Sequence, residues 1–225
     1  MSTFQEVTAK KYKDQAIFFL NAFWAEAGSD AEKIWEQYHL VCELDVENKE
    51  EGFKLDEFQA HRFFEKEGIA MSVQEMRQTL HVQDPKFKKI AFIEFLLFKY
   101  KQTIEELMTR PQGTCDNPEV IKAQQALEEV QKVIRGIENK KAELSQKSKG
   151  TGVAAMRAKA ELEQLCSGDN TELNKALITA EAQVRKVQKL TGCTGSIAAQ
   201  GMMWWMNREL EEAKKYKPQR QGGHK

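Results

Sequence analysis

The amino-acid sequence predicts an all-α protein with two parts, because its aromatic content and its apolar periodicity both change near residue 100. All twelve phenylalanines lie between Phe4 and Phe98, and no aromatic residue occurs from Lys101 to Met203. The first part carries two helix-loop-helix patterns, and the second carries two long segments with apolar residues at coiled-coil spacing. We therefore expect an aromatic core followed by an aliphatic one.

One long amphipathic helix is predicted from Asn117 to Lys147. Asparagine followed by Pro118 is typical of a helix start, and the Gly-Thr-Gly run at 150–152 is typical of a stop. Apolar residues recur along it in steps of three and four, which is the spacing of a helix that packs against a partner. This seam consists of Val120, Ala123, Leu127, Val130, Ile134, Ile137 and Leu144.

A second long helix provides the partner for that seam. Asn170 and Thr171 predict its start, and a shorter helix from Val153 to about Cys166 connects the two long ones. The C-terminal part is therefore predicted to be a three-helix, antiparallel coiled-coil-like hairpin over residues 117–191. The second seam consists of Leu173, Leu177, Ala180, Val184, Val187 and Leu190.

The two N-terminal loops share the ending of an EF-hand loop. Such a loop has a branched or aromatic residue at its eighth position, which pairs with its twin, a glutamate at its twelfth, and an aromatic residue at its thirteenth. We therefore predict an EF-hand-like helix-loop-helix pair over residues 14–109. The residues that fit are Phe53, Glu57 and Phe58 in the first loop and Ile90, Glu94 and Phe95 in the second.

Most ligand positions of these loops lack the oxygen atoms that calcium requires. The second loop has Gln83, Pro85 and Phe87 at those positions, so it is not expected to bind metal. Calcium at the first loop is one interpretation. An acidic loop that keeps only the EF-hand scaffold is the other, and we favour it because calcium coordination geometry is strict. The candidate metal ligands of the first loop are Asp45, Glu47 and Glu57.

Three further segments complete the predicted organisation. Residues 1–13 are expected to form a loose polar arm, residues 110–116 a linker, and residues 192–225 a tryptophan-bearing helix with a basic tail. Trp204 and Trp205 are adjacent in that helix. They either anchor a partner or pack back on their own domain, and the second is the commoner arrangement.

Composition excludes several classes of function. Lys+Arg and Asp+Glu are equal at 34 each, which argues against a dedicated nucleic-acid binder. The four cysteines and four histidines form no metal-ligand or catalytic motif, so we expect reduced thiols and no enzyme. The longest apolar run is too short to span a membrane.

Three stretches carry a resemblance to a known family: FLNAFWAE from Phe19, ALITAEAQVR from Ala176 and WWMNRELEE from Trp204. They resemble the calcium-regulated actin-bundling proteins of amoebae and ciliates. The resemblance implies an EF-hand-bearing N-terminal part, a helical C-terminal part, binding to actin filaments and their cross-linking, and a cytoplasmic, cytoskeletal location. Because the second loop departs from the calcium loop of the family, calcium regulation is expected to be weak or lost.

Exposed cations on the long helices and the tail are the candidate contacts to the acidic actin filament. Charge pattern alone favours an ordinary solvated surface, and only the resemblance reverses that preference. Two alternatives remain at this stage: a calcium sensor or store that uses the first loop without actin, and a scaffold that engages another coiled coil. Bundling needs two filament sites, so self-association is left open. The candidate actin-binding residues are Lys132, Arg135, Lys140, Arg185, Lys186, Lys189, Lys214 and Lys215.

Overall fold

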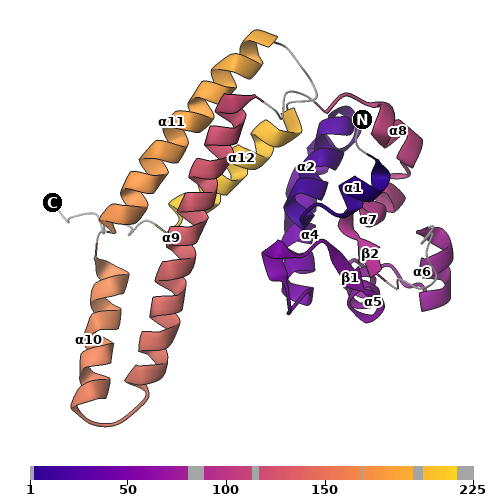
Figure 1. The fold of residues 1–225 in the computed structure, drawn as a ribbon. Coiled ribbons are helices and arrows are strands. Elements are labelled where there is room, and N and C mark those ends of the chain that lie inside the picture. Colours follow the sequence, from indigo (N-terminus) through magenta and orange to yellow (C-terminus); the bar gives the residue numbers. More distant parts are fainter. Residues whose placement is uncertain (1–2, 81–88, 113–116, 169, 195–199, 217–225) are drawn as a thin grey trace. The chain divides into compact units, whose positions relative to one another are not determined.

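The computed structural model of the chain describes residues 3–80, 89–112, 117–168, 170–194 and 200–216 (Figure 1). Contacts divide the chain into two units. Unit 1 comprises Met1–Gly113 and Ser196–Met202, and unit 2 comprises Thr114–Gly195 and Met203–Lys225. Apart from one two-stranded sheet, the described elements are helices, which confirms the predicted all-α class.

Unit 1 contains two helix-loop-helix units that meet across an antiparallel pair of short strands. The helices α4 and α5 flank β1, and α6 and α7 flank β2 (Figure 1). Two short 3₁₀ helices, Gly28–Asp30 and Lys49–Glu51, complete the unit. The elements are α1 (Phe4–Thr8), α2 (Tyr12–Ala22), α3 (Trp24–Ala27), α4 (Ala31–Leu44), β1 (Lys54–Asp56), α5 (Glu57–Lys66), α6 (Val73–Thr79), β2 (Lys89–Ala91), α7 (Phe92–Tyr100) and α8 (Ile104–Thr109).

The aromatic residues of unit 1 form its core. The Phe63 ring lies edge-on to the Phe95 ring, with centroids 4.6 Å apart, and Phe64 approaches the same ring at 5.2 Å. Edge-to-face pairs of this kind add to the free energy gained from burying the rings. The twin helices α5 and α7 are therefore joined through the core as well as through β1 and β2.

In the described part of the predicted loose arm, from Thr3 to Lys13, the chain instead forms α1 and the start of α2. Thr3 and Glu6 form a reciprocal capping box at the start of α1, and Val7 is fully buried. Tyr12, also fully buried, opens α2. The prediction of a loose arm was wrong because it rested on the polar composition of the segment and overlooked that Val7 and Tyr12 can be buried.

Unit 2 is the predicted helical hairpin. Its elements are α9 (Pro118–Ser148), α10 (Val153–Ser167), α11 (Thr171–Thr194) and α12 (Gln200–Lys214), whose first three residues belong to unit 1. With 31 residues, α9 is about 46 Å long. Along it, α10 packs on the C-terminal half and α11 on the N-terminal half (Figure 1).

The two predicted seams are buried against each other, with small departures. Leu127 of α9 and Leu177 of α11 represent them at 1% and 0% exposure. Leu190 is exposed although it continues the second seam, and α10 buries Ala155 and Ala158 while Met156 faces outward. Small alanines allow α10 to approach α9 closely. The size of the apolar side chains therefore did not predict which side of α10 is buried.

The helix α12 makes polar contacts to α11, and Tyr216, which follows it, contacts α9. Trp205 is fully buried and Trp204 is partly exposed, so the Trp205 ring is not presented to a partner. None of the described helices is both long and apolar enough to cross a membrane. Polar contacts fix α12 in place: Gln188 Nε2 donates to Asn207 Oδ1 (2.9 Å), Lys214 pairs with Glu181 (2.6 Å), and the Tyr216 hydroxyl donates to Glu138 (2.6 Å).

Replacing Leu177 with alanine is expected to lower the free energy of unfolding of unit 2 by about 2–4 kcal/mol, because it leaves a cavity in the seam. The neighbouring Ile178, 64% exposed, gives the matched control Ile178→Ala, which should change it by less than about 0.5 kcal/mol. Urea denaturation followed by circular dichroism measures both. Equal effects of the two substitutions would contradict the seam.

Candidate functional site

The first loop of unit 1 is closed around a buried carboxylate. Asp45 ends α4 and is only 2% exposed. The Tyr12 hydroxyl donates to its Oδ2 at 2.9 Å, and the backbone and side-chain amides of Asn48 donate to its Oδ1 at 3.1 and 3.2 Å. The Tyr12 backbone N–H donates to the Gly52 carbonyl at 3.0 Å. Protein donors thus occupy the oxygen atoms that a cation would use.

Close packing makes this arrangement specific. A Cβ atom on Gly52 would lie 2.2 Å from Asp45 Oδ2 and 2.6 Å from the Tyr12 ring, so no larger residue fits there. Burial, with the hydrogen bond to Asp45, raises the pKa of Tyr12 far above its ordinary value, so the hydroxyl keeps its proton and remains a donor. We call Tyr12, Asp45, Asn48 and Gly52 the loop lock.

The strand pairing corrects the predicted register of the first loop. Leu55 lies opposite Ile90, so Leu55 and not Phe53 holds the eighth position. Counting on, the twelfth position is Gln59 and not Glu57. An amide at this position cannot supply the bidentate carboxylate of a calcium loop.

Both twelfth-position side chains cap the helices that follow the strands. Gln59 N–H donates to Asp56 Oδ1 at 2.8 Å, and Asp56 N–H donates back to Gln59 Oε1 at 3.0 Å. In the twin unit, Ala91 N–H donates to Glu94 Oε2 at 2.7 Å, and burial raises the pKa of the Glu94 carboxyl. The Asp-x-x-Gln pattern at 56–59 was a capping signal that the sequence analysis missed.

The structure does not bring the three predicted metal ligands together. Asp45 is held in the loop lock, Glu47 is exposed, and Glu57 forms a two-contact ion pair with Arg77 of α6. Across the described part of the chain, no three or more His, Cys, Asp or Glu side chains gather as a metal site. Gln83, Pro85 and Phe87 of the second loop lie outside the described residues.

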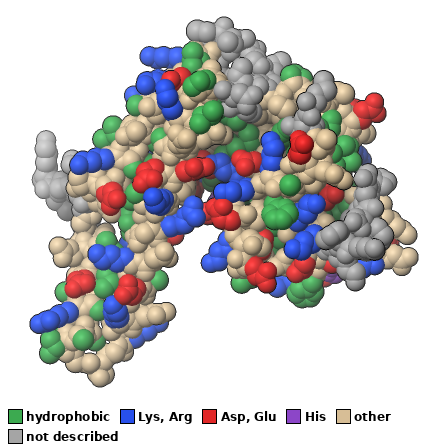
Figure 2. Space-filling model, in the orientation of Figure 1, with side chains coloured by type: hydrophobic (Ala, Val, Ile, Leu, Met, Phe, Trp, Pro, Cys, Tyr) green, Lys and Arg blue, Asp and Glu red, His purple; other side chains and the backbone are tan. Residues whose placement is uncertain are grey.

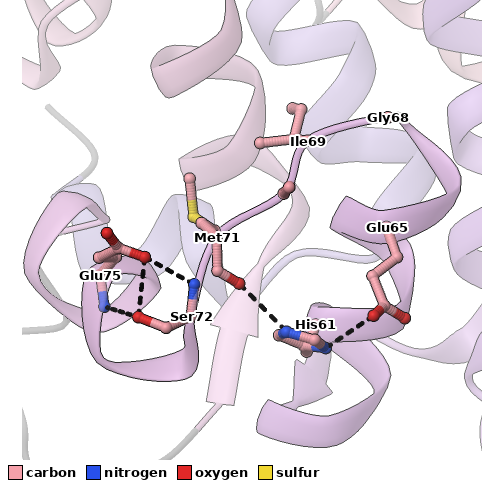
Figure 3. A pocket seen from close by; sticks show the side chains of 8 residues that line it. His61, Glu65, Gly68, Ile69, Met71, Ser72 and Glu75 are labelled. Carbon is pink, nitrogen blue, oxygen red and sulfur yellow. Dashed lines mark hydrogen bonds and ion pairs between the residues drawn. The ribbon is translucent and has the colours of Figure 1, made fainter.

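Unit 1 also has a pocket of about 560 Å³ between α5 and α6 (Figure 3). His61 Nε2 lies 3.1 Å from the Met71 carbonyl oxygen, and His61 Nδ1 lies 3.7 Å from Glu65. Ser72 and Glu75 form the capping box that starts α6. These contacts hold the segment that connects the two helix-loop-helix units, which gives the pocket residues a structural role.

In unit 2, the predicted actin-binding cations fall into separate groups. Lys132 and Arg135 form the α9 face, and Arg185, Lys186 and Lys189 form the α11 face; all five are exposed. Because α9 and α11 turn their seams toward each other, helical spacing places most of these cations on the two outer sides of the helix pair. Lys186 lies close enough to α9 to act electrostatically on Glu119. Sequence spacing alone did not reveal this arrangement of the two faces.

The predicted actin-binding cations differ in how far neighbouring carboxylates neutralise them. Lys214 and Lys215, at the end of α12, pair with Glu181 at 2.6 Å and Glu212 at 2.8 Å. Lys132 lies 3.7 Å from Glu129, an exposed contact that contributes little. Within the described ranges, no ion pair forms at Lys140, which lies on the half of α9 covered by α10, or at any cation of the α11 face. The α11 face is therefore the more available of the two.

Together these features define a class: a helical protein with an EF-hand-like pair, whose first loop is closed by its own side chains, and a hairpin with two basic faces. The family model described as "F actin bundling C terminal" matches residues 89–220. The chain is 34% identical to the "Calcium-regulated actin-bundling protein" of Dictyostelium discoideum over 268 residues, covering 98% of this chain and 90% of that protein. It belongs to this family of F-actin bundling proteins.

A solved structure gives the same result for the fold. The crystal structure of the 34 kDa F-actin bundling protein from Dictyostelium discoideum superposes with a TM-score of 0.83 at 33% identity, covering 96% of each chain. The family resemblance inferred from the residues is confirmed.

The loop lock predicts a measurable coupling between Tyr12 and Asp45. Tyr12→Phe removes a donor from a buried carboxylate and should lower the free energy of unfolding of unit 1 by about 1–3 kcal/mol. In a double-mutant cycle with Asp45→Ala, the two changes should be non-additive by at least about 1 kcal/mol. Denaturation of the four proteins in urea gives the cycle, and additive effects would show that the contact carries no stability.

Proposed function

We propose that this protein binds the sides of actin filaments and bundles them. The observation that carries the proposal is the match, over nearly the whole chain, to a protein named as a calcium-regulated actin-bundling protein. Exposed basic residues on the hairpin support it, since they suit the acidic surface of a filament. A cytoplasmic, cytoskeletal location follows from this function, and no catalytic role is proposed.

Bundling requires two filament contacts per particle, and the hairpin suggests where they lie. Most cations of the α9 face and the α11 face lie on the two outer sides of one helix pair, so each face can meet a different filament. Exposed cations attract an acidic partner over about a Debye length, which speeds encounter and makes binding salt-sensitive. A single copy of the chain is then sufficient for cross-linking. Lys140, Lys214 and Lys215 are secondary contacts in this scheme.

Calcium control through the first loop is not part of the proposal. The loop lock occupies Asp45, and Gln59 stands at the position of the bidentate ligand. These features also disfavour the alternative of a calcium sensor or store that uses this loop. The scaffold alternative is disfavoured because the seams of α9 and α11 are already buried within the chain.

Charge reversal of one face at a time tests the two-contact scheme. Lys132→Glu with Arg135→Glu, or Lys186→Glu with Lys189→Glu, should leave side-binding, seen as pelleting with filaments at high speed, and reduce bundling, seen at low speed, by at least about fivefold. Reversing both faces should abolish both. The matched control is Lys33→Glu with Lys66→Glu, which makes the same change of charge at exposed positions of unit 1.

Two outcomes would count against this scheme. If either single-face variant bundles filaments as well as the unchanged protein, the face concerned is not a filament contact. If the control variant loses bundling to the same extent, net charge and not position explains the effect.

Calcium should leave bundling unchanged, because Asp45 is occupied by the loop lock and Gln59 stands where the bidentate glutamate of a calcium loop would be. Low-speed pelleting with calcium and with chelator measures this. Inhibition by calcium that Asp45→Asn removes would contradict the loop lock, whereas inhibition that persists in Asp45→Asn would assign the switch to the second loop.

A further inference from the structure

The turn end of the α9–α10 hairpin carries a second, unassigned basic surface. We call residues Lys141–Ala160 the hairpin tip; it joins the end of α9 to the first half of α10 (Figure 1). Figure 2 shows Lys and Arg side chains beside hydrophobic ones near this end of the hairpin, with acidic side chains among them. None of these residues belongs to the α9 face or the α11 face.

Positive charge is concentrated here in a chain whose net charge is zero. The tip has five cations and one carboxylate, Glu143, a net charge of +4. Lys147 pairs with Glu143 at 2.5 Å and also interacts electrostatically with Glu161, which follows the tip. In the described part of the chain the other four cations form no ion pair. These four are Lys141, Lys149, Arg157 and Lys159.

Apolar side chains project outward among these cations. Val153 and Met156 are 67% and 74% exposed, and with Ala160 they recur at i, i+3 and i+7 along one side of α10. The opposite side buries Ala155 and Ala158 against α9. The first half of α10 thus has an apolar stripe on each side, and α9 accounts for only the inner one.

The start of α10 adds a site of positive potential at the same place. Gly152 precedes it with φ 97° and provides no side-chain cap, and the first turn contains no acidic residue. Its free N–H groups and the positive end of the helix dipole therefore reinforce the charge of the neighbouring Lys149 and Arg157.

We propose that the hairpin tip docks on an anionic lipid bilayer. An apolar stripe flanked by cations, on a convex end, inserts between lipid headgroups while the cations contact phosphate and carboxylate groups. A filament would need a matching concave pocket for Val153 and Met156, whereas a bilayer accepts them without one. The protein would in this way hold filaments beside a membrane, through residues that filament binding does not use.

Sedimentation of the full-length protein with phosphatidylcholine vesicles, with and without phosphatidylserine, tests the proposal in the absence of actin. Binding is expected only with phosphatidylserine and should weaken with salt. Val153→Glu with Met156→Glu, and separately Lys149→Glu with Arg157→Glu, should each reduce the bound fraction at least about tenfold. Reversal of Lys132 and Arg135 is the matched control and should not affect it.

The outcomes separate a membrane contact from a filament contact. Both tip variants should pellet with actin filaments as the unchanged protein does, and circular dichroism should show the same helix content. Failure of the unchanged protein to bind phosphatidylserine vesicles, or equal binding by the tip variants, overturns the proposal. Loss of filament binding in the tip variants, with no vesicle binding by the unchanged protein, would assign the tip to the filament surface instead.

Discussion

The packing of the α9 seam is the interaction on which the rest of unit 2 depends. A helix about 46 Å long cannot bury its apolar stripe against one short neighbour, so α10 and α11 share it end to end. The sharing of the α9 stripe between α10 and α11 determines which side chains of the hairpin face outward. It turns most of the cations of the α9 and α11 faces to the two outer sides of the helix pair and leaves the outer side of α10 uncovered at the hairpin tip. Two basic faces and the hairpin tip thus follow from one hydrophobic constraint.

In unit 1 the corresponding constraint is polar: the buried Asp45 carboxylate must be satisfied by hydrogen bonds. Its fold keeps the paired strands and twin helices of an EF-hand pair, yet Tyr12 and Asn48 supply internal donors to Asp45. A buried carboxylate needs such donors in the absence of a cation, because an unpaired buried charge is costly. The segment around α1 and Tyr12 is therefore part of the loop that it closes.

The sequence predicted the features that are encoded locally. Seam residues such as Leu127 of α9 and Leu177 of α11 recur regularly along their own helices, so periodicity predicted both helices and their pairing. The predicted register of the first loop was wrong because Phe53 and Leu55 both suit a strand. Only the pairing with Ile90 of the partner strand places Leu55 at the eighth position. The burial of Asp45, the pairing of Lys214 with Glu181 and the outward placement of the two basic faces arise from tertiary packing, which composition does not record.

Electron cryotomography of filament bundles formed by the protein tests whether one copy of the chain bridges two filaments. We expect cross-bridges that each contain one copy of the chain, with α9 against one filament, α11 against the other, and a gap of about 20 Å set by the thickness of two packed helices. Cross-bridges that contain two copies, or filaments that contact the same side of the hairpin, would contradict this expectation.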